Sequence, residues 1–278
     1  MRSARRKAMA RTKSKSKRKR WVVKAGSNLI CTGGPLLIRS WATQIAALKK
    51  QHDIEVVWVT SGAIATATER TGFGRGKRTL AEKQALSAVG QPLVMDLYNL
   101  SLQTAGLLGA QVLLTSDDLA DRERKQNFQN TIEVLLKWDA TPVLNENDAV
   151  ATEEIRFGDN DSLSARVARA VGADRLVILT DVEGLYESDP RSNPNARLIP
   201  WLPGVSPSQI KKVFDQSGKR AGSSRGTGGM HSKLMAAKLA TSVGIDTWLV
   251  KGDLSSVLID VARERTVGTR IEARRKRR

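Results

Sequence analysis

The sequence predicts an α/β protein, a three-layer α/β/α sandwich with a mainly parallel central sheet. Short runs of Val, Ile and Leu alternate along the chain with longer helical stretches, which is typical of β-α-β units. The apolar runs are nearly continuous, as expected for strands that are covered on both faces. No long Pro, Gly or Ser linker interrupts the alternation, so we expect one continuous domain over residues 21–273.

Each expected element follows from a local pattern. Six short aliphatic runs predict the strands Trp21–Val23, Ile54–Thr60, Leu107–Leu114, Thr141–Leu144, Arg175–Thr180 and Asp246–Val250. Six longer stretches predict the helices Ser40–Gln51, Leu80–Gln103, Arg124–Trp138, Ser162–Val171, Ser206–Gln216 and Met230–Val243. Several Pro, Gly and Ser residues between Gly184 and Gly229 predict exposed loops there.

The formal net charge of +18 over 278 residues would suit a nucleic-acid binder, but its distribution is uneven. Residues 1–20 contain eleven Lys or Arg and no acid, and residues 274–278 are five consecutive basic residues. The body between these segments holds 30 basic and 28 acidic residues. We therefore expect disordered basic tails at 1–20 and 274–278, which could bind nucleic acid weakly and non-specifically.

The remaining composition narrows the class of protein. With 40% hydrophobic residues the body can bury a substantial core. Cys31 is the single cysteine, so an internal disulfide is excluded and a reducing cytoplasmic location is expected. No apolar run approaches the roughly 18 residues of a membrane span. His52 and His231 are too few and too distant for a zinc site, and no protein metal site is predicted.

Polar and glycine-rich clusters follow the expected strands. In parallel sheets ligands bind beyond the carboxyl ends of the strands, so these clusters should converge on one rim. The clusters are Lys24–Ser27, Thr60–Ala63, Asn145–Asp148, Thr180–Asp181, Gly158–Asp161 and Gly226–Lys233.

These clusters contain what phosphoryl transfer requires. Glycines at strand-to-helix turns let backbone N–H groups approach phosphate oxygens, and the following helix adds its positive end. Lys24 and Lys233 could neutralise the charge of a transferring phosphoryl group, although either could also be a solvated surface lysine. Neither a Walker P-loop nor a dinucleotide-binding glycine motif occurs in the sequence.

The carboxylate clusters allow two interpretations. The segment Asp159–Asp161 precedes an apolar helix and could be only an N-cap. Asn145–Asp148 could likewise be a turn. Beside the lysines, both segments could instead orient the lysine side chains, help organise Mg²⁺ or receive a substrate ammonium group.

Taken together, the motifs resemble the amino acid kinase family from about Trp21 to Ile271, and within it the enzymes that act on glutamate. The matching strings begin with Val22–Ser27, Val59–Ala65, Asp121–Arg124 and Pro142–Val150. They continue with Gly158–Ala165, Leu179–Tyr186, Asp189–Pro194 and Gly226–Lys233. Some of these strings also occur in relatives such as uridylate kinase and aspartokinase, so a uridylate kinase activity is one alternative. A nucleic-acid-associated protein that acts through its tails is another.

The resemblance implies ATP-dependent phosphorylation of the γ-carboxylate of L-glutamate, the first step of proline synthesis, with Mg²⁺ on the nucleotide. It implies catalytic roles for Lys24, Lys233 and Asp161, with Asp161 orienting both lysines. The glutamate-binding residues would be Ser61, Asp148, Asn160 and, nearby, Asn145. The ATP-binding residues would be Lys24, Thr180, Asp181, Thr227, Gly228, Gly229, Met230, His231, Ser232 and Lys233.

The resemblance also carries expectations about regulation and assembly. Proline is a feedback inhibitor in the family, so it is expected to compete with glutamate here. We expect a homo-oligomer, a dimer or a tetramer. Many bacterial members carry a carboxyl-terminal PUA domain of RNA-binding type. Only basic residues follow the kinase body in this sequence, so no PUA domain is expected.

Overall fold

The computed structural model describes residues 18–151, 160–211 and 229–273. Eight strands in these residues form one sheet in the order β3-β4-β2-β1-β5-β7-β8-β6. The strands are β1 (Lys19–Ala25), β2 (Ile54–Val59), β3 (Leu108–Leu114), β4 (Ala140–Glu146), β5 (Arg175–Thr180), β6 (Trp201–Leu202), β7 (Asp246–Lys251) and β8 (Thr269–Ile271). All neighbouring strands pair parallel except β7 and β8, so the predicted mainly parallel sheet is confirmed.

The helices that lie wholly within the described residues are α1 (Ser27–His52), α2 (Ala63–Thr71), α3 (Leu80–Thr104), α4 (Ser116–Ala120), α5 (Arg122–Lys137), α6 (Asn160–Ala170), α8 (Met230–Ser242) and α9 (Val257–Ala262). Of the helix expected over Ser206–Gln216, residues 207–211 are helical and the rest lies outside the described residues.

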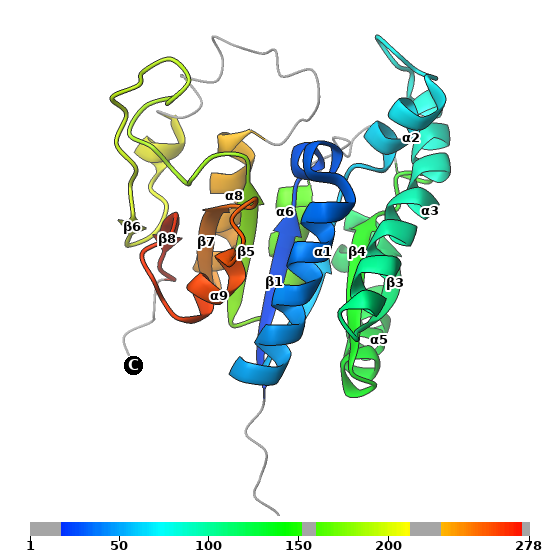
Figure 1. Cartoon of the computed structure of the whole chain (residues 1–278), viewed down its shortest axis with the longest axis horizontal. Helices are drawn as coiled ribbons and strands as arrows, with labels where there is room; N and C mark the ends of the chain where they lie inside the picture. The colour runs from blue at the N-terminus through cyan, green and yellow to red at the C-terminus, as the bar shows by residue number, and fades with distance from the viewer. Residues whose placement is uncertain (1–17, 152–159, 212–228, 274–278) are drawn as a thin grey trace, which may run out of the picture.

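Alternating side chains of the strands divide the core into two layers. Trp21 and Val23 of β1 pack with residues of α1, α3 and α9 on one face of the sheet. Val22, between them, packs with residues of α5, α6 and α8 on the other face. This alternation follows from the pleat of a strand and gives the predicted α/β/α layering, which Figure 1 shows from the side of α1.

The first strand begins two residues earlier than expected. Lys19 and Arg20, which we had assigned to the disordered tail, belong to β1. Arg20 is buried because its guanidinium pairs with Glu55 at 2.6 Å and Glu133 at 2.6 Å and donates to the carbonyl oxygen of Val171. The folded body therefore includes the last residues of the basic segment, and the charge of Arg20 is balanced by two carboxylates.

The first helix also begins earlier than expected. The helical stretch starts at Ser27, directly after β1, rather than at Ser40. A kink at Gly34, whose φ is 50°, divides this helical stretch just before Pro35. Glycines and a proline in this stretch hide the helical pattern in the sequence. The consequence for function is that a helix amino terminus lies directly beside Lys24.

None of the helices in the described part of the chain is both long and apolar enough to cross a membrane.

Candidate active site

The carboxyl ends of the central strands define the candidate site. The sheet order places β2 on one side of β1 and β5 on the other. In open parallel sheets a ligand crevice forms where successive connections leave in opposite directions, which here is the end of β1. This end of β1 lies at the upper edge of the sheet in Figure 1.

Lys24, Lys233 and Asp161 form the electrostatic centre of the site. Asp161, in the first turn of α6, is fully buried. Its Oδ1 lies 2.6 Å from Lys24 Nζ of β1, and its Oδ2 lies 3.2 Å from Lys233 Nζ of α8. The structure therefore brings together the three residues predicted to be catalytic, although Lys233 lies 72 positions from Asp161 and Lys24 is farther away still in the sequence.

Burial and the neighbouring charges shift the pKa of Asp161 in opposite directions. Burial by itself would raise the pKa of the Asp161 carboxyl, because the charged form loses its hydration. Attraction to Lys24 and Lys233, with a hydrogen bond from Ser232, outweighs burial and holds this pKa well below its usual range. The group is consequently a carboxylate at neutral pH, with two buried lysines placed on either side of it.

Two helix amino termini approach this centre. Gly26 is the N-cap of α1 and Gly229 is the N-cap of α8, and neither N-cap residue supplies a side-chain cap. Helix starts offer backbone N–H groups and positive partial charge, which suits phosphate oxygens. The α8 terminus contains the predicted ATP-binding residues Gly229 to Lys233, whereas Thr227 and Gly228 lie outside the described residues.

Ser232 contacts the electrostatic centre formed by Lys24, Asp161 and Lys233. Its hydroxyl donates to Asp161 Oδ2 at 2.6 Å, and it lies 2.9 Å from the carbonyl oxygen of Gly229. Ser232 thus helps to hold Asp161 between the lysines, which the sequence did not predict.

Thr180 and Asp181 follow β5 and form a second part of the rim. Thr180 is buried, and its hydroxyl donates to Asp181 Oδ1 at 3.2 Å. Asp181 Oδ2 pairs with Arg191 at 3.0 Å. Arg191 belongs to the Asp-Pro-Arg motif, and its backbone N–H donates to Asp189. This motif therefore contacts the predicted nucleotide-binding residues.

The predicted glutamate-binding residues gather beyond β2 and β4. Ser61 donates its hydroxyl to the carbonyl oxygen of Ala25 at 3.0 Å, which joins the ends of β2 and β1. Gly62 follows with a φ of 96°, a conformation that favours glycine, and starts α2. Asn160 donates to the carbonyl oxygen of Thr60 and to Asn145 Oδ1, at 2.6 and 2.7 Å.

Asn160 has an unused buried acceptor atom, and Asp148 is a buried carboxyl group beside the same site. No hydrogen bond among the described residues reaches Asn160 Oδ1, although the atom is buried. Burial raises the pKa of Asp148. The hydroxyl of Ser87 donates to Asp148 Oδ2 at 3.1 Å, and this hydrogen bond lowers the same pKa by less than burial raises it. A buried acceptor and a buried carboxylate of this kind suit a ligand that carries an ammonium group.

Sequence reasoning missed Ser87 and Gln91 of α3. Gln91 Oε1 accepts from Asn145 Nδ2 at 2.6 Å, and both α3 residues are buried against the site. The signal was two polar residues four positions apart within a helix whose buried positions are mainly apolar.

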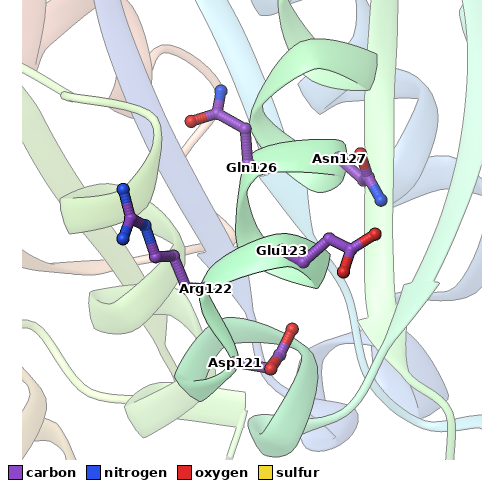
Figure 2. A pocket seen from close by; sticks show the side chains of 5 residues that line it. All are labelled: Asp121, Arg122, Glu123, Gln126 and Asn127. Carbon is purple, nitrogen blue, oxygen red and sulfur yellow. The ribbon is translucent and has the colours of Figure 1, made fainter.

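A separate pocket lies at the start of α5. Its volume is about 430 Å³, and Figure 2 shows the side chains that line it, Asp121, Arg122, Glu123, Gln126 and Asn127. None of the residues predicted for the active site lines this pocket. In the described part of the chain no group of three or more His, Cys, Asp or Glu side chains could hold a metal ion.

Two buried lysines around Asp161, with two helix amino termini beside them, can stabilise a negatively charged group during its transfer. Residues 19–251 match the amino acid kinase family. The chain belongs to this family, as its motifs indicated.

Individual relatives of this chain carry names that are more specific than the family. The chain is 44% identical over 260 residues to a protein named glutamate 5-kinase from Burkholderia cenocepacia, covering 92% of this chain and 68% of the relative. It is 45% identical over 258 residues to a glutamate 5-kinase from Deinococcus radiodurans, covering 91% and 69%. It is 43% identical over 264 residues to a glutamate 5-kinase from Delftia acidovorans, covering 91% and 68%.

Proposed function

We propose that this protein transfers the γ-phosphate of ATP to the γ-carboxylate of L-glutamate, giving γ-glutamyl phosphate and ADP, the first step of proline synthesis. The observation that carries the proposal is the Lys24–Asp161–Lys233 arrangement at the end of β1. The names of the relatives supply the acceptor, because each is a glutamate 5-kinase.

The two lysines have complementary roles in this proposal. In phosphoryl transfer, negative charge is spread over the transferring group and over the attacking and leaving oxygens. Lys233 lies at the start of α8 and would stabilise negative charge on the nucleotide side. Lys24 lies at the end of β1 and would stabilise negative charge on the transferring group. Asp161 holds both ammonium groups in place before the substrates bind, so less reorganisation is needed during the reaction.

The nucleotide fits the α8 side of the site. The first turns of α1 and α8, which follow the N-cap residues Gly26 and Gly229, would donate backbone N–H groups to the phosphates of ATP. Mg²⁺ would come with ATP, supplying charge neutralisation while it keeps water and phosphate oxygens as ligands. Both Asp161 oxygens lie against lysines, so Asp161 does not fit a metal-ligand role.

Glutamate fits the other side of the site. Asp148 and the Oδ1 atom of Asn160 would accept hydrogen bonds from its α-ammonium group. Ser61 would contact its carboxylate, and the γ-carboxylate would then face Lys24. Competition by proline and a homo-oligomeric state stay predictions, which an assay with millimolar proline and sedimentation would check.

A substrate panel tests the proposal. Purified protein with ATP and Mg²⁺ should yield γ-glutamyl hydroxamate from glutamate in the presence of hydroxylamine, and should release little ADP with aspartate, acetylglutamate or UMP. Phosphorylation of UMP but not of glutamate would instead support a uridylate kinase within the same fold.

A further inference from the structure

Three polar residues of α3 hold the segment 145–151, which comprises the end of β4 and the residues that follow it. Gln84, Ser87 and Gln91 are spaced three and four residues apart, so they lie along one side of the helix. Gln84 Nε2 donates to the carbonyl oxygen of Ala151 at 3.0 Å, and Ser87 donates to Asp148. Gln91 accepts from Asn145. The helix therefore anchors this segment at three points.

The contact of Gln91 starts a chain of three buried amides. Gln91 Oε1 accepts from Asn145 Nδ2 at 2.6 Å, and Asn145 Oδ1 accepts from Asn160 Nδ2 at 2.7 Å. Asn160 Nδ2 donates a second time, to the carbonyl oxygen of Thr60 at 2.6 Å. An Asn amide has two N–H donors, so both donors of Asn160 are used within the protein.

The direction of the chain is set at its two ends, at Gln91 and at the carbonyl oxygen of Thr60, which can only accept. Because Gln91 presents its oxygen to Asn145, the Asn145 amide group must face Gln91 and its oxygen must face Asn160. Asn160 is thereby held with Oδ1 directed away from these partners, and no hydrogen bond among the described residues reaches that atom. A reversed chain would present an NH₂ group there, which repels an ammonium ion.

We propose that Gln91 is a positioning residue that selects for an amino acid substrate. Acting through Asn145, and together with the Thr60 carbonyl, it fixes Asn160 so that the Asn160 carbonyl oxygen receives the substrate's α-ammonium group. The inference rests on the proposed function and deepens it, because it assigns discrimination between glutamate and its deamino analogue, glutarate, to a residue that touches neither.

The test compares glutamate with glutarate in Gln91→Met, which keeps the length of the side chain but removes its acceptor. Dissociation constants are measured by calorimetry with a non-hydrolysable ATP analogue and Mg²⁺. We expect glutamate binding to weaken about tenfold, the scale for one misplaced hydrogen bond to a charged group, and glutarate binding to change by less than about twofold. Gln91→Glu keeps an acceptor oxygen and should preserve the wild-type preference.

Matched controls separate positioning from general damage. Gln103→Met makes the same chemical change at an exposed position of α3 and should alter neither constant. If Gln91→Met does not fold, Gln91→Asn replaces it, because that amide is too short to reach Asn145.

Several results would overturn the inference. Equal weakening of glutamate and glutarate in Gln91→Met would assign the residue a purely structural role. Loss of the preference in Gln91→Glu would show that the acceptor oxygen is irrelevant. Absence of hydroxamate formation by the wild-type protein would instead refute the proposed function, and that assay is carried out first.

Discussion

At the scale of single residues, Asp161 is the side chain that determines the electrostatics of the site. Its single negative charge is shared between two buried lysines, from β1 and α8, and these elements are held together across the end of the sheet. A buried ion pair is weak evidence for stability, but removing one partner leaves uncompensated charge. In the proposed function Asp161 therefore links folding to the placement of the two lysines for phosphoryl transfer.

The change Asp161→Asn should destabilise the protein. It keeps the side-chain shape but leaves Lys24 and Lys233 without a counter-charge, and losing one partner of a buried pair costs about 3–5 kcal/mol. Urea unfolding measures this loss. Asp53→Asn is the matched control because it breaks a surface pair with Arg18, which is worth about 1 kcal/mol or less. Equal effects of the two changes would contradict this account of Asp161.

The raised pKa of Asp148 predicts a pH dependence of glutamate use. In the proposed function the charged carboxylate binds the substrate ammonium, so kcat/KM for glutamate should fall as the pH drops through this raised pKa. Ser87→Ala removes the hydrogen bond that lowers the pKa, so the acid limb of the pH profile should move to higher pH. Ser101→Ala, at another buried serine of α3, should leave the profile in place, and a shift of equal size there would count against the role of Ser87.

The sequence predicted some site residues better than others. Lys24 and Lys233 could be found because each lies beside glycines at an expected strand-to-helix boundary. Gln91 and Ser87 could not be found, because their role depends on which side of α3 faces β4, and this is a tertiary contact. Ser232 was predicted for the nucleotide, but its contact with Asp161 depends on the placement of α6 against α8.

At the scale of elements, the close approach of α2 and α3 positions the Ser61–Gly62 turn. Gly90 of α3 lies so close to α2 that a Cβ there would stand 1.8 Å from the carbonyl oxygen of Ala63. Only a glycine allows this contact. The carbonyl belongs to the residue directly after Gly62, so any separation of the two helices should displace the predicted glutamate-binding turn.

Gly90→Ala should therefore impair both stability and glutamate binding. Overpacking typically costs about 1–3 kcal/mol, and the better helix propensity of Ala offsets only about 1 kcal/mol. We expect lower resistance to urea together with a raised KM for glutamate. The reverse change at exposed Ala88, Ala88→Gly, should cost about 1 kcal/mol through propensity and leave this KM unchanged. An unaltered KM in Gly90→Ala would contradict the positioning role of this contact.

The elements themselves were predictable where their patterns are long. The central strands and α3 match the expected ranges within a few residues. The sequence did not reveal β6 and β8, because two or three residues carry no periodicity. The short helices α2, α4 and α9 were also missed, since propensity is weak over so few residues.

At the scale of the whole molecule, the basic amino-terminal segment has two parts. Residues 1–17 hold eight Lys or Arg and no acid, and they lie outside the described residues. Lys19 and Arg20 instead form the start of β1, and Arg20 is held by Glu55 and Glu133. The net charge therefore says little about the chemistry of the site.

Two truncations should separate these parts. Deleting residues 1–17 and 274–278 should leave kcat within about twofold and abolish any salt-dependent nucleic-acid affinity, since that affinity scales with the phosphate contacts removed. Deleting residues 1–20 should also destabilise the body, because it removes Arg20 from its buried ion pairs. Melting temperature, turnover and a salt titration measure these effects. Equal stability of the two truncated proteins would contradict the place of Arg20 in the fold.

The central claim is that Lys24 and Lys233, held by Asp161, stabilise a transferring phosphoryl group. Steady-state turnover of Lys24→Ala and Lys233→Ala with glutamate, ATP and Mg²⁺ tests it most directly. Losing one preorganised charge-stabilising donor should lower kcat by about two to three orders of magnitude in each variant. Near-normal kcat in both folded variants would contradict the claim.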